Sequence, residues 1–405
     1  MIIVSAALAL ALSACEPQAR DTTFVVSSDP ELGAQVSALL PDLAFRAGME
    51  LVRPIRVDRR TRDELESYLL FKLDQDLPAE KARALTRTYS LVGLVDEGLD
   101  LRQLLVSVYK EQVAGFYDPD STALFVMDDM PAEMLETVLI HELVHAVQDQ
   151  TANLDSLTAD ERGNDRQAAA QSAIEGHATL IMFEYMLEQM KGEPVDLSEL
   201  PDLSQALAPA LEAMRTQYPA LASAPAIIQE DLLFPYLKGN GFVLALWTEK
   251  GGRPPPFGSN QPQSTEQILN PSRAFGAEVD LPTELELEAV PGYPAVYGNV
   301  FGQAEFETLL EKHLGPDGRA LAQGWDGDRF ALLTRPDGGD GLVWVSVWDS
   351  EEERDRFVNG FQPALARFQE PATLERMEVL GRPGAILRVG LSGEVSVQVR
   401  EGSAR

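Results

Sequence analysis

The sequence predicts an α+β protein: a large, mostly helical domain with a small sheet, followed by a smaller α+β domain. Three observations predict this arrangement. Apolar residues recur at three- and four-residue spacing through most of residues 30–250, which is the period of amphipathic helices. Two short stretches near residues 51–57 and 112–127 change to strand-like patterns. From residue 300 onward, short strand-like runs and helical runs are mixed, which is typical of α+β domains.

The same periodicity places the elements in order. A strand is expected at Leu51–Val57, and Gln112–Tyr117 and Thr122–Met127 flank a turn-forming cluster and predict a β-hairpin. A long helix is expected to begin near Pro131, and a polar loop at Ala152–Asp165. The other expected helices are Glu64–Leu73, Ala79–Leu94, Leu101–Tyr109, Arg166–Met190, Leu203–Gln217, Ile227–Lys250, Gln303–His313 and Glu351–Phe368. The other expected strands are Arg329–Thr334, Leu342–Trp348, Glu378–Leu380, Ala385–Val389 and Val395–Val399.

The N-terminus predicts export. Ile2–Leu12 is an apolar run too short to cross a bilayer but of the length found in signal peptides. Leu12-Ser13-Ala14-Cys15 follows and resembles the lipobox of bacterial lipoproteins, although no Lys or Arg precedes the apolar run. The resemblance implies cleavage before Cys15, a lipid on that residue and a place on the periplasmic face or cell surface. An ordinary signal peptide is the alternative.

Composition divides the rest of the chain. We expect a signal peptide at 1–15, a polar tether at 16–29, the main domain at 30–250, a Pro/Gly-rich connector at 251–299 and the smaller domain at 300–405. The chain carries 33 Lys and Arg against 64 Asp and Glu, a net charge of −31. A phosphate backbone would be repelled by this charge, so nucleic acid is not an expected partner.

One stretch, LIHELVHAVQDQ at residues 139–150, carries the main chemical signal, and it sits in the segment 112–190 that we expect to form the metal core. Only four histidines occur in the chain, yet His141 and His145 lie four apart. On a helix that spacing puts both imidazoles on one face, where they can bind one cation. Glu142 points about 100° away around the helix axis and can take a proton from a metal-bound water. The pattern predicts a zinc site with its catalytic base.

A catalytic zinc uses three protein ligands and leaves one position open. The segment after residue 166 offers Glu175 and His177, which cannot both face the metal from one helix. Glu175 shares its face with small residues, Ala168, Ser172, Ala178 and Thr179, whereas Ile174, Leu180 and Ile181 flank His177. The small face permits a close approach to another helix, so Glu175 is the favoured third ligand. His177 is expected in the core or bonded to a carbonyl, and His313 as a cation near a helix C-terminus.

The motif HELVH, followed by Glu175-Gly176-His177-Ala178 on a later helix, resembles the gluzincin class of zinc metallopeptidases. The resemblance covers residues 112–187. It implies that His141, His145 and Glu175 bind Zn²⁺ and that Glu142 is the general base. It also implies that substrate peptide lies along an edge strand, here Thr122–Met127, and that a tyrosine, here Tyr236, stabilises the oxyanion; packing near a helix start is the alternative for Tyr236. Weaker similarity to uncharacterised bacterial zincin-like lipoproteins extends further along the chain.

Two departures from thermolysin-like enzymes stand out. The longer interval between His145 and Glu175 makes Ala152–Asp165 an insertion, and Thr179 stands where those enzymes carry an aspartate that orients a zinc histidine. Asp149 is expected to be a solvated charge. The leading hypothesis is a lipid-anchored zinc metallopeptidase that hydrolyses peptide bonds by Glu-assisted attack of zinc-bound water. The alternatives are a non-catalytic, zinc-stabilised binding scaffold and a zymogen inhibited by residues 30–110.

Overall fold

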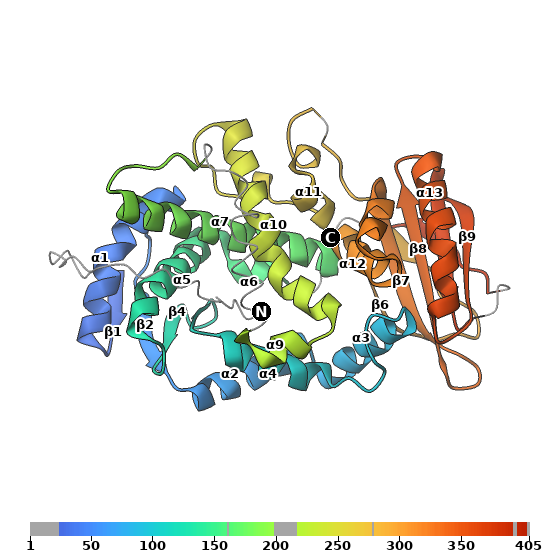
Figure 1. The fold of residues 1–405 in the computed structure, drawn as a ribbon, viewed down its shortest axis with the longest axis horizontal. Coiled ribbons are helices and arrows are strands. Elements are labelled where there is room, and N and C mark those ends of the chain that lie inside the picture. The colour runs from blue at the N-terminus through green and yellow to red at the C-terminus, as the bar shows by residue number, and fades with distance from the viewer. Residues whose placement is uncertain (1–23, 160–161, 198–216, 278, 392–394, 403–405) are drawn as a thin grey trace.

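The computed structural model describes residues 24–159, 162–197, 217–277, 279–391 and 395–402. The predicted signal peptide 1–15 with Cys15, most of the tether, and nearly all of the predicted helix Leu203–Gln217 lie outside these ranges. The α+β class is confirmed: a helical region with a small sheet is followed by a sheet-rich C-terminal region (Figure 1). No described helix has the length and apolar character needed to span a membrane.

The first sheet has four strands in the order β1-β2-β4-β3. Its members are β1 Val25–Ser27, β2 Ile55–Arg60, β3 Gly115–Asp118 and β4 Ala123–Met127. The first three strands of this order are parallel, and β3 closes the sheet as an antiparallel hairpin partner of β4, as the sequence predicted. The prediction of a tether at 16–29 is wrong for residues 25–27, because β1 pairs there with β2.

Nine helices of the described chain belong to the same N-terminal region as this sheet. They are α1 Pro30–Ala47, α2 Arg62–Asp76, α3 Ala79–Leu91, α4 Leu101–Gln112, α5 Ala132–Ala152, α6 Leu154–Leu157, α7 Asn164–Lys191, α9 Pro219–Ser223 and α10 Ala226–Lys250. Local signals explain several ends. Asp29 caps α1 by accepting from Glu31 N–H and Leu32 N–H, and Thr61 forms a capping box with Glu64. The predicted loop Ala152–Asp165 contains α6 and the start of α7.

The C-terminal sheet is antiparallel, with the strand order β6-β7-β8-β10-β9. Its strands are β6 Ala295–Asn299, β7 Trp325–Thr334, β8 Asp340–Trp348, β9 Ala372–Val379 and β10 Arg382–Val389. Helices α12 Gly302–Leu314 and α13 Glu351–Phe361 cover one face, where Phe306, Trp344, Trp348 and Phe357 pack as an aromatic core. The strands β5 Leu285–Leu287 and β11 Val399–Glu401 form a two-stranded sheet over the other face.

The expected connector 251–299 is structured. It contains β5, β6 and α11 Thr265–Leu269, with 3-10 turns at Gly258–Asn260 and Pro271–Arg273. Helix α11 packs against α7, α10 and α12, and β6 forms an edge of the C-terminal sheet. The Pro/Gly content predicted a linker because it disfavours long helices, but short elements tolerate these residues when they pack on neighbours.

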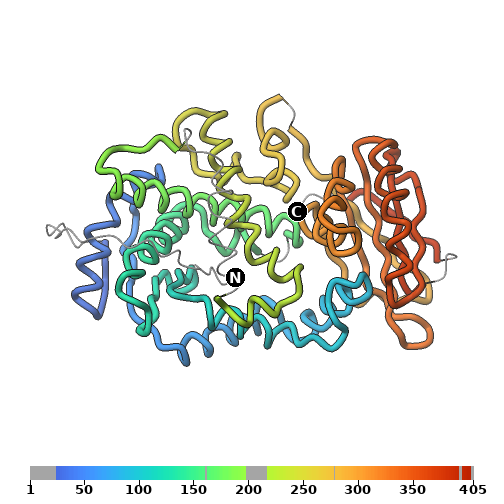
Figure 2. Tube along the Cα trace, in the orientation of Figure 1, coloured from blue at the N-terminus to red at the C-terminus, as the bar shows by residue number. Residues whose placement is uncertain are grey.

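The two expected domains share a core. Helix α3 lies against β6, β7 and β8 (Figure 2), and its residue Tyr89 belongs to the same buried cluster as Phe301 and Trp344. Val92, Ile227 and Ile228 from the N-terminal region also lie in this cluster. The expected boundaries at 250 and 300 therefore do not separate two independent hydrophobic cores.

Candidate metal centre

The centre is built on α5 and α7, which both run through the main hydrophobic core. Every residue of α5 from Thr137 to Asp149 is buried, and so is every residue of α7 from Ser172 to Met182. Neither stretch contains proline, and both are rich in helix-forming residues. The two helices therefore form a rigid frame for the polar side chains between them.

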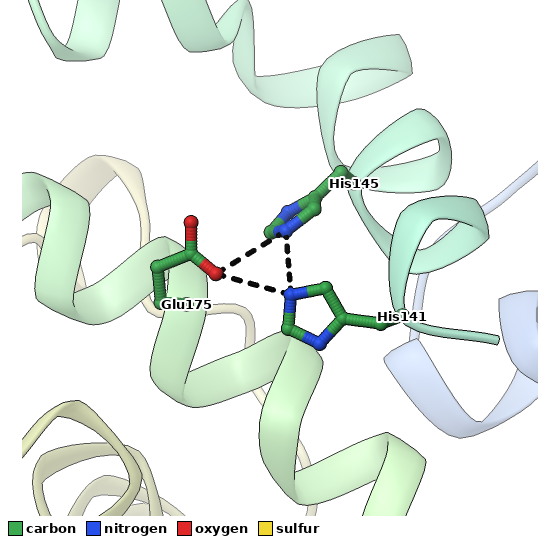
Figure 3. A group of neighbouring side chains, drawn as sticks. All are labelled: His141, His145 and Glu175. Carbon is green, nitrogen blue, oxygen red and sulfur yellow. Dashed lines mark hydrogen bonds and ion pairs between the residues drawn. The ribbon is translucent and has the colours of Figure 1, made fainter. Parts of the chain in front are cut away.

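The structure brings His141, His145 and Glu175 together (Figure 3). The two Nε2 atoms lie 3.0 Å apart, and Glu175 Oε2 lies 3.1 Å from His141 Nε2 and 3.4 Å from His145 Nε2. Zinc binds nitrogen and oxygen at about 2.0–2.2 Å, so neighbouring corners of its tetrahedron are separated by about 3.3–3.5 Å. The three observed separations are close to this triangle, so the donor atoms fit a zinc-sized ion without rearrangement of the helices.

The electrostatics of the same three residues favour positive charge. Burial lowers the pKa of His145, but the Glu175 carboxylate outweighs it and raises that pKa to about 9. Burial likewise raises the pKa of Glu175, but the two histidines hold it at about 2. The field between these side chains therefore stabilises a cation, and a metal ion can replace the proton there.

Gln148 sets the tautomer of His145, and sequence reasoning missed it. Its Nε2 lies 3.0 Å from the carbonyl of Ile174, which can only accept, so the amide nitrogen must face α7. Its Oε1 then faces His145 Nδ1 at 2.9 Å, and that nitrogen must carry the proton. When a metal ion replaces the second proton, Nε2 of His145 presents its lone pair to the centre. Gln148 follows His145 by three residues on one helix face, which was the available sequence signal.

His177 lies behind this amide and not at the centre. Its Nδ1 lies 3.0 Å from Gln148 Nε2, and the rings of Trp247 and Phe257 contact it edge-on. Burial and the neighbouring His145 lower the pKa of His177 to about 3, so it is neutral. The expectation of a core histidine is correct, but its partner is an amide and not a carbonyl.

Glu142 is fully buried, and its Oε2 accepts the backbone N–H of Tyr117 at 2.9 Å. Strand β3 therefore fixes the orientation of the predicted base. The prediction that Thr122–Met127 is the substrate-binding edge is wrong, because β4 is paired on both sides, with β2 and β3. The edge strand beside α5 is β3.

Asp149 is not a solvated charge. It is buried, forms an ion pair with Arg53 at 2.6 Å, and accepts the hydroxyl of Tyr117 at 2.9 Å. These contacts tie the end of α5 to the strand that holds Glu142. The residue does not bond to His145, whose Nδ1 partner is Gln148. The expectation was wrong because the fold brings Arg53, distant in sequence, over this helix end.

Gly176 and Ser172, on the small-residue side of α7, pack against α10. A Cβ on Gly176 would lie 2.1 Å from Gly239 C, and a Cβ on Gly239 would lie 1.9 Å from Ser172 O. Only glycine at both positions permits this crossing. Thr179 Oγ1, on the same helix, is buried without a hydrogen-bond partner among the described residues.

This crossing places Tyr236 of α10 beside the centre. Its ring centroid lies 6.2 Å from that of His141. Burial and the neighbouring Glu175 and Glu142 carboxylates hold the pKa of Tyr236 well above its usual range, so the hydroxyl keeps its proton. Its hydroxyl is hydrogen-bonded to the Glu175 carboxylate, which places it at the edge of the centre.

Two other groups carry potential metal-binding atoms. His313 lies near the end of α12, as expected, but it is buried, its Nε2 donates to Val92 O at 2.7 Å, and burial lowers its pKa, so it is not a cation. The acidic residues Glu266, Asp280 and Asp349 also converge. Arg273 pairs with the last two, so this group is explained as an ion-pair network.

Comparison with known proteins adds one functional finding. Residues 79–226 match a family model described as "Putative metallopeptidase family (DUF6782)". This match supports a metallopeptidase. The matched range contains His141, Glu142, His145 and Glu175, and it stops before Tyr236. Residues 292–403 match a second model, described as "Domain of unknown function (DUF8575)". No curated protein and no solved structure matches the chain.

Proposed function

We propose that the chain is a zinc-dependent peptidase of gluzincin type, with His141, His145 and Glu175 as the metal ligands. The observation that carries the proposal is the convergence of these three donor atoms at separations of 3.0–3.4 Å beside a buried carboxylate held by an edge strand. A zinc ion in this position supplies a Lewis acid that lowers the pKa of water to about 7 and polarises a carbonyl.

The chain's own residues supply the proton transfers. Glu142 accepts a proton from the attacking water and passes it to the leaving amine, while Tyr117 N–H keeps its carboxylate in one orientation. The protonated hydroxyl of Tyr236 donates to the oxygen that develops negative charge as the scissile carbonyl is attacked. Gln148 holds His145 in the tautomer that presents Nε2.

The alternative function is a scaffold in which a metal only joins helices. Closed structural sites use four protein ligands. Among the described residues, the cluster at this position contains three potential ligands, His141, His145 and Glu175. A structural site needs no proton acceptor, so the carboxylate of Glu142 beside these ligands favours catalysis.

The deciding experiment compares wild type with Glu142→Gln, using the full chain. We expect wild type to bind one zinc and to cleave members of a peptide library. Glu142→Gln should retain zinc and lose at least about 100-fold in kcat/KM, because general-base catalysis typically contributes 10²–10⁴. Zinc binding without cleavage by wild type would instead support the scaffold.

We also propose that the chain works outside the cytoplasm, attached to a membrane by a lipid on Cys15. The support is the apolar run Ile2–Leu12 and the sequence that follows it. Mass spectrometry of the protein purified from membranes should find the N-terminus at a lipid-modified Cys15.

A further inference from the structure

A cavity of about 320 Å³ is lined mainly by residues of α3, α7, α10, α11 and α12. Helix α7 lines it with residues at helical spacing, from Asn164 through Gln167 to Gln171. Glu175 continues the same face one turn, about 6 Å, beyond Gln171. Gln171 Nε2 donates to Glu175 Oε1 at 2.7 Å, so the inner end of the cavity adjoins a proposed metal ligand.

The opposite wall comes from α10, and it reaches the same centre. Phe234 and Pro235 line the cavity and directly precede Tyr236. The volume lies at the lower end of the range for ligand pockets, about 300–1,000 Å³. Gln171, which bonds to Glu175, and Pro235, which precedes Tyr236, both line this cavity, so it can hold one large side chain of a substrate bound at the centre.

Carboxyl groups dominate the charges around this cavity. Its lining includes Glu230, Asp231, Glu305 and Glu307, against Lys238 and Arg319. Arg319 lies 3.4 Å from Glu230 and 3.6 Å from Glu307 and also pairs with Glu311, so Glu230 and Glu307 share one cationic partner. Within the part of the chain that the structure describes, Asp231 and Glu305 have no ion-pair partner.

The uncompensated pair sits among apolar and aromatic surfaces. Leu85, Tyr89 and Phe301 contribute to the walls, and the Tyr89 hydroxyl donates to Glu305 Oε2 at 3.0 Å. Such walls suit the aliphatic stem of a lysine or arginine, whose charged end then meets carboxylates. An aromatic ring near a cation adds a further attraction.

We propose that this cavity is the specificity pocket of the enzyme and that it receives a lysine or arginine side chain of a peptide substrate, with Asp231 and Glu305 as the anionic partners. This inference rests on the proposed peptidase function. It names the substrate class, peptides with a basic residue near the scissile bond, and it assigns recognition to α10 and α12 rather than to the metal helices.

Three further observations agree with a cationic occupant. Although Asp231 is exposed as a residue, desolvation of its carboxyl group by the surrounding groups and the adjacent Glu230 raise its pKa to about 7, and burial and Asp231 raise the pKa of Glu305 well above its usual range. A cation between them would relieve this repulsion, whereas a neutral side chain would not. Pro235 has no N–H, so the backbone carbonyl of Asp231, one turn earlier in α10, lacks the usual helical hydrogen bond and can accept one from an occupant. Gln171 Oε1 is buried without a hydrogen-bond partner among the described residues.

The test measures binding separately from cleavage. Labelled peptides, in which lysine is scanned through each position, are titrated against the full chain carrying Glu142→Gln, and each is paired with a peptide that has norleucine in place of lysine. At one position we expect lysine to bind at least tenfold more tightly than norleucine. Adding Asp231→Asn or Glu305→Gln should bring that ratio close to one. Glu352→Gln, an exposed change on α13, should leave the ratio unchanged.

The outcomes separate the two proposals. Equal affinity for lysine and norleucine at every position, no binding of any peptide, or a ratio that survives both pocket substitutions would overturn the pocket. Loss of the ratio in Asp231→Asn alone is sufficient support, because this residue is exposed and its change is not expected to unfold the chain. A lysine preference in binding without any cleavage by wild type would refute the peptidase and leave the pocket standing.

Discussion

Replacing Gln148 by methionine tests how the centre is organised. Methionine has a similar length but cannot donate to Ile174 O or accept from His145 Nδ1, which lie 3.0 and 2.9 Å from the amide. The buried Nδ1–H then has no partner, at a cost of about 1–3 kcal/mol. The imidazole can also rotate or change tautomer. Loss of such an outer partner typically weakens metal binding 10–100-fold, which corresponds to about 1.4–2.8 kcal/mol.

The assay is zinc competition with a chromogenic chelator at fixed pH, using the full chain. Gln112→Met is the matched control, because Gln112 is also buried and, among the described residues, its side chain bonds to Val108 O of its own helix α4. We expect Gln148→Met to lose at least tenfold in zinc affinity and the control to match wild type. Zinc affinity of Gln148→Met within twofold of wild type would show that helix packing alone orients His145, and the argument for Gln148 would be refuted.

Three other predictions concern the supports of the site. Gly239→Ala should destabilise the fold by about 1–3 kcal/mol in chemical denaturation, because its Cβ would overlap Ser172 O; Gly241→Ala, whose Cβ meets nothing within 4 Å, should be neutral or stabilising. Tyr236→Phe should lower kcat about 10²-fold with zinc content unchanged, and unchanged kcat would remove Tyr236 from the mechanism. Burial raises the pKa of Asp165 to about 7, although Thr265 donates hydrogen bonds to its carboxyl group. The carboxyl group ionises above about pH 4 in the unfolded chain but only near pH 7 in the folded chain. The free energy of unfolding therefore falls as the pH rises from about 4 to 7. Asp165→Asn should therefore gain melting temperature relative to wild type more at pH 8 than at pH 5, and a pH-independent difference would contradict this.

The local parts of the site could be predicted from sequence because helical periodicity is a local property. Spacing along α5 places His141 beside His145 in any straight helix, and the small face of α7 singled out Glu175 over His177. The presence of helices at α7 and α10 was also predictable, because both segments are long and carry apolar residues at helical spacing.

The parts of the fold and of the site that could not be predicted depend on contacts between segments far apart in the chain. Gly239 meets Gly176 where α10 crosses α7, and Arg53 pairs with Asp149 at the end of α5; no local pattern encodes either contact. The order of the strands in the first sheet could not be predicted for the same reason. The hairpin β3–β4 was evident, but the pairing of β2 with β4, which moves the edge to β3, follows only from the packed sheet. The sequence shows Gln148 three residues after His145. Its role depends on the carbonyl of Ile174, which fixes the orientation of the Gln148 amide.

The proposed peptidase function depends most directly on one metal ion held by His141, His145 and Glu175. The measurement that tests it is anomalous X-ray diffraction at the zinc absorption edge from crystals of the full chain grown with one equivalent of zinc. We predict a single strong peak about 2.0–2.2 Å from His141 Nε2, His145 Nε2 and a carboxylate oxygen of Glu175. A peak bound by other residues, or none at this position in zinc-loaded protein, would contradict the account.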